Sequence, residues 1–300
     1  MSARRRTLAA ASLGSALALA LAACGADSPH DSSTPRTGKP SASASPTGTG
    51  HDHSSMPGMD MNDGDGLAGE KDGYRLTSNA ATLPAGKGTD YRFAVTGPDG
   101  KPVTRFTVEQ TKRLHFYAIR SDLTGFQHLH PTMADDGTWT AGLAALQPGS
   151  WRLFAQFTPH SGTGRSQDLV LSRTVTVPGP AATTPLPKVS TTTEVDGYTV
   201  TVRGELMAGM AHPLTVTVSK DGKPVTDLQP YLDSYAHLTA FHEGDQAFAH
   251  LHPRNKVNGD HGGPGLSFHA ELAKSGNWRL FLQFRTAGRL HTAALTLHVS

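Results

Sequence analysis

A pattern of three histidines that recurs at a fixed offset constrains this 300-residue chain more than any other feature. Each histidine returns 122 positions later: His115, His128 and His130 in the first copy, and His237, His250 and His252 in the second. The flanking residues are repeated as well. FQHLHP at 126–131 corresponds to FAHLHP at 248–253, and DGKPVT occurs at both 99–104 and 221–226. A repeat of this length indicates two copies of one domain.

Each copy has the pattern of a series of short strands. Apolar and polar residues alternate at 91–95, 114–119 and 151–157, and turn-forming Pro, Asp and Gly residues separate such segments. Trp151 and Trp278 lie on alternating apolar runs, where a sandwich places its core tryptophan. About seven strands in about 105 residues predict an all-β fold, built as two tandem immunoglobulin-like β-sandwich repeats.

Composition divides the chain into five parts. We expect a signal peptide at 1–23, a disordered tether that contains Met and His at 24–73, repeats at 74–177 and 191–300, and a proline-rich linker at 178–190. The tether is rich in Ser, Pro, Gly, Thr and Asp, and it has too little apolar surface to offset the entropy of an ordered chain.

The amino terminus carries the features of an export signal. Arg4, Arg5 and Arg6 precede a short apolar run at 8–20, and the sequence LAAC then ends at Cys24. The segment resembles bacterial lipoprotein signal peptides, which implies cleavage before Cys24 and a lipid on its sulfur. This resemblance places the mature chain on the extracytoplasmic face of the cell membrane. An ordinary secretory signal is the alternative, and the choice between Sec and Tat export stays open.

Cysteine content and charge exclude several classes of function. Cys24 is the only cysteine, so the mature chain has no disulfide, no blue-copper ligand set and no cysteine-based zinc site. Without residues 1–23 and their three arginines, the net charge is −1. A chain so close to neutral gives no indication of a nucleic-acid partner.

The repeated histidines have the spacing of a metal site. His128 and His130 are two residues apart on a short strand, so both side chains leave the same face, and His115 lies on the preceding strand. A hairpin between these strands would bring the three imidazoles to one point. Copper(II), zinc and nickel(II) accept three imidazoles, and three ligands leave one position open. We therefore expect one such centre in each repeat, with His291 as a further ligand candidate in the second.

The tether adds a second set of candidate ligands. The segment HDHSSMPGMDM contains His51, His53, Met56, Met59 and Met61 within eleven residues. Thioether sulfur is a soft ligand that suits copper(I), while imidazole serves both copper oxidation states. The combination favours copper as the bound metal, with zinc as the alternative.

The histidine-bearing segment also carries a family resemblance. The stretch that runs from His115 through Asp122-Leu123 to Pro131 resembles uncharacterised secreted proteins and lipoproteins of bacteria, which carry an immunoglobulin-like domain with a Phe-x-His-x-His-Pro motif. The second copy departs from that pattern, with Glu243-Gly244-Asp245 in the loop. By class and composition the chain is also similar to small β-sandwich copper carriers of the bacterial envelope, which is an analogy.

Two functions follow as hypotheses. The first is a membrane-anchored metal-binding lipoprotein that sequesters copper or delivers it to another envelope protein. The alternative is a non-catalytic structural or adhesive surface lipoprotein whose histidines are packing residues. The sequence holds no nucleophile elbow, zincin helix, phosphate loop or dinucleotide fingerprint, so no enzyme is expected.

Overall fold

A computed structural model describes residues 65–300 of the chain. These residues form 18 β-strands and no helix, so none of them form a helix with the length and apolar character of a membrane span. The signal peptide, Cys24 and the five tether ligands lie outside the described residues. The predictions about them therefore stay predictions.

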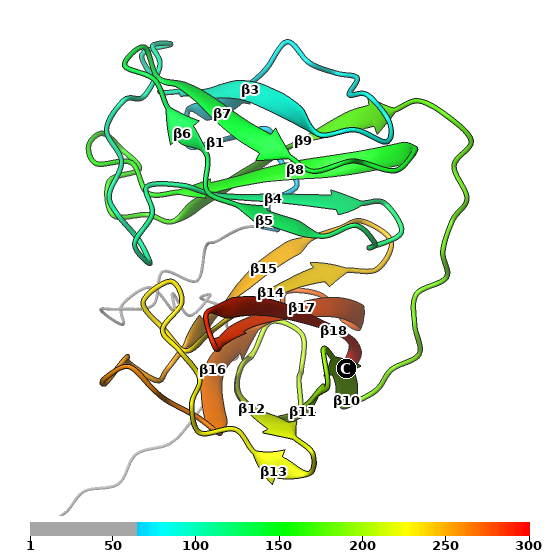
Figure 1. The fold of residues 1–300 in the computed structure, drawn as a ribbon. Coiled ribbons are helices and arrows are strands. Elements are labelled where there is room, and N and C mark those ends of the chain that lie inside the picture. Colours follow the sequence, from blue (N-terminus) through cyan, green and yellow to red (C-terminus); the bar gives the residue numbers. More distant parts are fainter. Residues whose placement is uncertain (1–64) are drawn as a thin grey trace, which may run out of the picture. The chain divides into compact units, whose positions relative to one another are not determined.

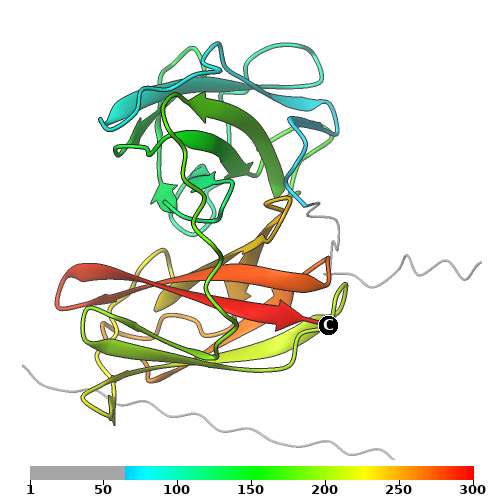
Figure 2. The ribbon, with the colours of Figure 1, turned by 90° about the vertical axis from the view of Figure 1, so that its right-hand side faces the viewer.

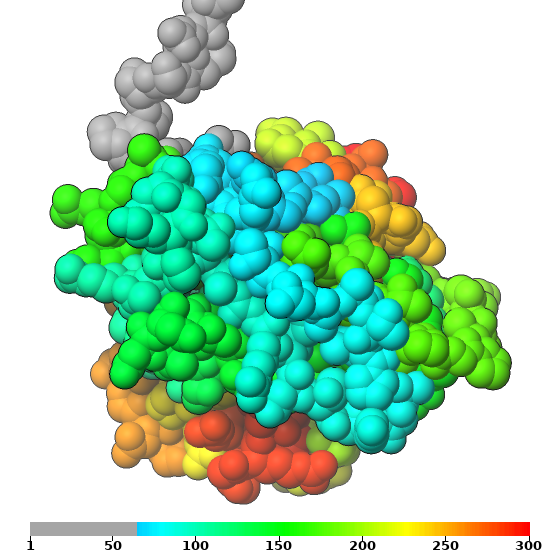
Figure 3. Space-filling view, turned by 90° about the horizontal axis from the view of Figure 1, so that it is seen from above, coloured from blue at the N-terminus to red at the C-terminus, as the bar shows by residue number. Residues whose placement is uncertain are grey.

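Repeat 1 is a sandwich of two antiparallel sheets (Figure 1). We call the sheet with one face in solvent the outer sheet, and its order is β1-β2-β3-β7-β6. The other sheet is buried on both faces, and we call it the inner sheet; its order is β5-β4-β8-β9. Their bounds are β1 Glu70–Lys71, β2 Tyr74–Thr77, β3 Thr89–Thr96, β4 His115–Arg120, β5 Gln127–Leu129, β6 Thr132–Met133, β7 Thr138–Leu143, β8 Gly149–Phe157 and β9 Leu169–Val177. On β3 the exposed residues alternate with buried ones, so the outer sheet turns one face to solvent, the face seen in Figure 3.

Repeat 2 has the same strand order with two differences, an added short strand and a continuous strand that joins the two sheets. Its path is β10-β11-β12-β16-β15-β14-β17-β18, with β13 paired to β12. The bounds are β10 Thr192–Val195, β11 Tyr198–Arg203, β12 Ala211–Lys220, β13 Lys223–Pro224, β14 Ala236–His242, β15 Phe248–Pro253, β16 Gly265–Glu271, β17 Gly276–Thr286 and β18 Arg289–Val299. Strand β15 pairs with β14 over its first part and with β16 over its last two residues, so it joins the two sheets (Figure 2). In repeat 1 the strand is interrupted: β5 pairs with β4, and after His130 and Pro131 the separate strand β6 pairs with β7.

The strand order confirms the expected fold class. The sheets β2-β3-β7-β6 and β5-β4-β8-β9 follow the A-B-E-D and C′-C-F-G orders of an immunoglobulin domain with one added strand. Trp151 and Trp278 are each 1% exposed, as expected for core tryptophans. Their indole N–H groups donate to the carbonyls of Gln147 and Lys274, which are equivalent positions in the two repeats.

The inner sheets are buried on both faces. In β4 and in β14 every residue except the last is buried. A strand with one face in solvent would instead show buried and exposed residues in alternation. One face covers the core of its own repeat. The other face contributes to an apolar cluster drawn from both repeats: Tyr117, Ile119, Leu123, Phe154 and Val170 with Phe241, Phe248 and Phe281. Within it the Phe126 and Phe281 rings stack with centroids 4.2 Å apart.

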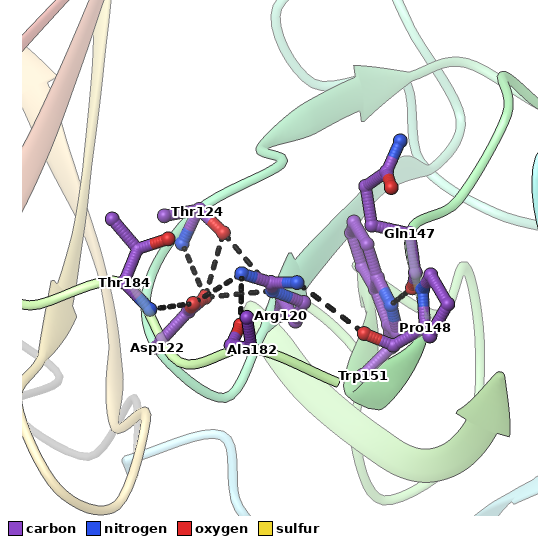
Figure 4. Close-up of polar contacts among 8 residues, drawn as sticks. All are labelled: Arg120, Asp122, Thr124, Gln147, Pro148, Trp151, Ala182 and Thr184. Carbon is purple, nitrogen blue, oxygen red and sulfur yellow. Dashed lines mark hydrogen bonds and ion pairs between the residues drawn. The ribbon is translucent and has the colours of Figure 1, made fainter. Parts of the chain in front are cut away.

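Two connecting segments pack against this core. Residues 65–73, which the sequence placed in the tether, include β1, and the Asp65 carbonyl accepts a bond from the Phe248 amide. The segment between β9 and β10 contains no strand, in agreement with its prolines. Figure 4 shows how the β4–β5 turn binds this linker: the Asp122 carboxylate accepts a hydrogen bond from the Thr184 amide at 2.9 Å and forms an ion pair with Arg120. The Arg120 guanidinium also donates to the Ala182 carbonyl.

Candidate metal site

The repeated histidines lie at equivalent places in the two inner sheets. His115 begins β4, and His237 is the second residue of β14. His128 lies on β5 and His250 on β15, each on the strand next to its partner, so the expected hairpin pairing is confirmed. Leu129 packs against the core of repeat 1, and its two histidine neighbours leave the opposite face.

The structure joins the histidines of both repeats into one cluster, where the sequence predicted a separate centre in each. Ring centroids of His128 and His237 are 4.6 Å apart, and those of His115 and His237 are 5.8 Å apart. His237 also lies 4.3 Å from His250 of its own repeat. The cause is the packing of the inner sheets: the face that carries the histidines is the face that meets the other repeat. Sequence periodicity describes one domain at a time, so it does not show which surface covers the second face of a buried strand.

Three of these side chains form a group in which two members are buried and His128 is half-buried. His115, His128 and His237 each offer a ring nitrogen, and these three atoms lie within 4.8 Å of one another. We call this set the inner group. His115 is 3% exposed and His237 is fully buried.

Hydrogen bonds fix which nitrogens of the inner group carry protons. His115 Nε2 lies 3.2 Å from the Glu109 carbonyl oxygen, which only accepts, so this nitrogen carries the proton. His128 Nδ1 lies 2.7 Å from Gln283 Oε1, which also only accepts. The remaining lone pairs, on His115 Nδ1 and His128 Nε2, face each other at 3.1 Å. Two facing lone pairs repel unless a cation or a proton lies between them.

Burial opposes a proton at this point. It lowers the pKa of His115 to about 4, with a small further decrease from Lys112, against the opposing effect of the Glu109 carbonyl. Burial also holds the pKa of His128 and of His237 well below the usual histidine range, and the neighbouring imidazoles add to the decrease. These three imidazoles are therefore neutral at pH 7, which is the form that binds metal.

His237 has unsatisfied polar atoms. Neither of its ring nitrogens has a hydrogen-bond partner among residues 65–300, although the side chain is completely buried. Leaving a buried polar atom unpaired costs about 1–3 kcal/mol. A metal ion bound to His115 and His128 would supply one of these nitrogens with a partner. His130 lies beside the group, with its ring 4.7 Å from that of His128, and its Nε2 is also unpaired within the described chain.

A second group lies next to the first. Asp168, His250 and His252 offer ligand atoms within 4.8 Å of one another, and they come from both repeats. We call this set the outer group, because His252 is exposed and the other two are half-buried. Asp168 was not among the ligands predicted from the sequence. It lies in the loop before β9, where one carboxylate among polar residues carries no distinguishing signal.

His291 is not part of either group. Its Nδ1 bonds to Asp196 at 2.7 Å, and its Nε2 bonds to the Thr286 hydroxyl at 2.9 Å. Both nitrogens therefore have partners within repeat 2. The sequence made His291 a further ligand candidate in the second repeat, but the structure gives it a hydrogen-bonding role near the start of β18.

Comparison with known proteins assigns the chain to a family. The DUF8832 family, described as a domain of unknown function, matches residues 69–175 and again residues 193–300. The chain belongs to this family and contains two copies of its domain. No curated protein matches the chain.

Several solved structures resemble the chain at low identity. The Escherichia coli adhesin FdeC is 16% identical over 77% of this chain and 65% of its own, with a TM-score of 0.25. InvD of Yersinia pseudotuberculosis is 15% identical over 76% of this chain and 57% of its own, with a TM-score of 0.25. A putative membrane-anchored protein of Corynebacterium diphtheriae is 10% identical over 77% and 59%, with a TM-score of 0.21. The chain spans less than two thirds of each of these, and we draw no functional argument from them.

Proposed function

We propose that this protein is a non-catalytic metal-binding lipoprotein of the bacterial cell surface. It binds a transition-metal ion at the inner group, and copper is the favoured metal. The observation that carries this proposal is the pair of lone pairs on His115 Nδ1 and His128 Nε2, 3.1 Å apart and backed by fixed hydrogen bonds. Two nitrogens at this separation, each about 2.0 Å from an ion, subtend roughly 100° at it. That angle suits tetrahedral or trigonal coordination.

The chemistry of the ligands favours copper or zinc. Neutral imidazole binds both copper oxidation states and zinc, whereas magnesium and calcium prefer oxygen ligands. The methionines and histidines proposed for the tether would capture copper(I) before it reaches the domains. The membrane anchor on Cys24 rests on the signal sequence alone. Sequestration or delivery to another envelope protein follows as the biological role.

The second candidate function is a structural or adhesive surface protein whose histidines pack the contact between the repeats. One observation favours it: the Tyr117 and His128 rings stack with centroids 4.4 Å apart and planes at 16°, as packing residues do. In this case the neutral imidazoles contribute only by packing their rings against neighbouring side chains. Substituting His237 by leucine would then leave the protein folded and fully functional.

Copper titration of the mature chain distinguishes the two functions. In the test protein, serine replaces the tether ligands His51, His53, Met56, Met59 and Met61, so that only the domains bind. We expect copper(II) binding tighter than about micromolar, with nitrogen hyperfine structure from imidazoles in the electron paramagnetic resonance spectrum. His128→Asn should weaken it by about 100-fold or more, which corresponds to about 2.7 kcal/mol.

A matched control keeps this test specific. His298 bonds to Asn277 on the exposed edge of repeat 2, so His298→Ala should bind copper as the parent does. Circular dichroism establishes that each variant is folded. Binding weaker than micromolar in the parent, or equal binding in the parent and in His128→Asn, would overturn the metal-binding proposal and leave the packing role.

A further inference from the structure

We infer that the outer group, Asp168, His250 and His252, is a second and weaker divalent metal site through which an ion reaches the inner group. This inference rests on the proposed function, because it assumes that the inner group binds metal. It assigns a different set of residues, a different affinity and a role in uptake.

The first support is a cavity that reaches the outer group. It has a volume of about 260 Å³, and its walls come from both repeats. His250 and His252 line it together with Asp168, and so does His115 of the inner group. The cavity therefore borders both ligand sets. It gives a solvated ion a space next to His115, whose own side chain is nearly inaccessible from solvent.

The second support is the graded burial of the ligands. His252 is exposed, and His250 is half-buried, while His237 is completely buried. The rings of His250 and His252 are 4.8 Å apart, and those of His237 and His250 are 4.3 Å apart. An ion can thus exchange one imidazole for the next without returning to water.

The third support is the ligand chemistry. A carboxylate with two imidazoles suits divalent ions such as copper(II) and zinc, and the carboxylate charge disfavours soft copper(I). Lys112 and Arg113 line the same cavity. They favour an anionic exogenous ligand, such as chloride or a small carboxylate, on the open positions of the bound ion.

Gln156 explains why the outer site is the weaker one. Its Nε2 group donates to Asp168 and lies 3.0 Å from His250 Nδ1, while its Oε1 accepts from the Tyr117 hydroxyl. The Gln156 amide is therefore oriented by three contacts. The lone pair of His250 Nδ1 is bound by an N–H donor, and the other ring nitrogen, Nε2, lies 3.4 Å from the Nε2 group of Gln110. Metal binding at His250 must therefore displace a glutamine side chain from one of the two ring nitrogens.

The inner group has the opposite arrangement at the equivalent position. Gln283 corresponds to Gln156 in the other repeat, but it presents its oxygen to His128 and so leaves His128 Nε2 with a lone pair. Hydrogen bonds of this kind to metal-bound histidine change affinity by about 10–100-fold. We expect the outer site to bind more weakly than the inner site by a factor in this range.

Zinc titration by isothermal calorimetry tests the stoichiometry. The protein is the full mature chain with the five tether ligands replaced by serine, and zinc(II) is the probe. Two ions should bind per chain, the second roughly 10–100-fold more weakly. Asp168→Asn and His252→Ala should each remove the second step and change the first by less than about threefold. His298→Ala is the control and should retain both steps.

Uptake kinetics test the route. Stopped-flow mixing with limiting zinc, followed by transfer from a chromophoric chelator, reports how fast the inner site fills. Asp168→Asn should slow this step by about tenfold, because the carboxylate concentrates cations at the cavity mouth.

Each outcome has one meaning. A single zinc step that Asp168→Asn leaves unchanged overturns this inference while the proposed function stands. A second step that survives both outer-group substitutions also overturns it. An unchanged filling rate overturns the route. If the parent binds no zinc and no copper, the proposed function and this inference fail together.

Discussion

The orientation of one side-chain amide decides what an imidazole can do in this protein. The Gln283 Oε1 atom accepts a hydrogen bond from His128 Nδ1, whereas the Gln156 Nε2 group donates a hydrogen bond to His250 Nδ1. The two glutamines are repeat equivalents, and each is the cross-strand neighbour of the β4 or β14 histidine of its own repeat. The difference follows from Asp168 and Tyr117, which hold Gln156 in its orientation. One histidine therefore has a lone pair ready for a metal ion, and its counterpart does not.

Substituting Gln283 tests this effect at the residue scale. Gln283→Met keeps the volume but removes the oxygen that fixes the His128 tautomer, so we expect metal affinity at the inner group to fall by roughly 10–100-fold. Copper or zinc titration measures it. The matched change in repeat 1, Gln156→Met, removes the donor to His250 and should strengthen the weaker binding step. Equal effects of the two substitutions would contradict the tautomer argument.

At the scale of elements, the β4–β5 turn holds the linker in place through a buried carboxylate. The Asp122 side chain is 4% exposed, pairs with Arg120, and accepts from the hydroxyl and the amide of Thr124. The Asp122 pKa is lowered because the Arg120 and Thr124 bonds outweigh the opposing effect of burial. In repeat 2 Asp245 occupies the corresponding turn and bonds to His242 and Lys274. The carboxylates of the two turns are therefore held by different partners, and only that of Asp122 binds the linker.

Removing the Asp122 carboxylate should be costly. Asp122→Ala leaves the Arg120 guanidinium without its partner in a mostly buried place, and we expect a loss of about 3–5 kcal/mol in the free energy of unfolding. The exposed pair Arg75–Glu70 is the control, since both side chains are at least half exposed and Glu70→Ala should cost less than about 1 kcal/mol. Urea denaturation of the two variants measures the difference. Similar losses would refute the role of the turn.

Much of each element was predictable from the sequence, and the contact between repeats was not. Alternation and turn residues predicted the strands, and the two-residue spacing placed His128 and His130 on one face. The segment at 114–119 was expected to alternate, but its run Phe116-Tyr117-Ala118-Ile119 is apolar throughout, and an unbroken apolar strand is buried on both faces. What covers its second face depends on the other repeat. Asp168 became visible only when that contact brought it beside His250.

On the scale of the whole molecule, the cluster makes stability depend on pH. Burial lowers the pKa of His115 to about 4 and, with the adjacent charges, that of His130 to about 3. An unfolded histidine titrates near 6.5. Between these values the unfolded chain binds protons that the folded chain excludes, so the free energy of unfolding decreases as pH falls.

We therefore expect the metal-free protein to lose stability between about pH 6.5 and pH 4. His115 alone contributes on the order of 3 kcal/mol over this interval. Denaturant titrations at a series of pH values measure the slope. His115→Gln should reduce the slope, while His298→Ala should not. A flat profile would mean that the folded chain admits protons to the cluster.

The stacking of His115 on His237, one histidine from each copy, has a consequence for how the chain is built. Neither domain alone carries a complete inner ligand set, since two of the three imidazoles come from one copy and the third from the other. Covalent linkage makes assembly of this set an intramolecular event that does not depend on protein concentration. A chain with a single copy of the domain would need to associate with a second molecule before it offered an ion the same three nitrogens.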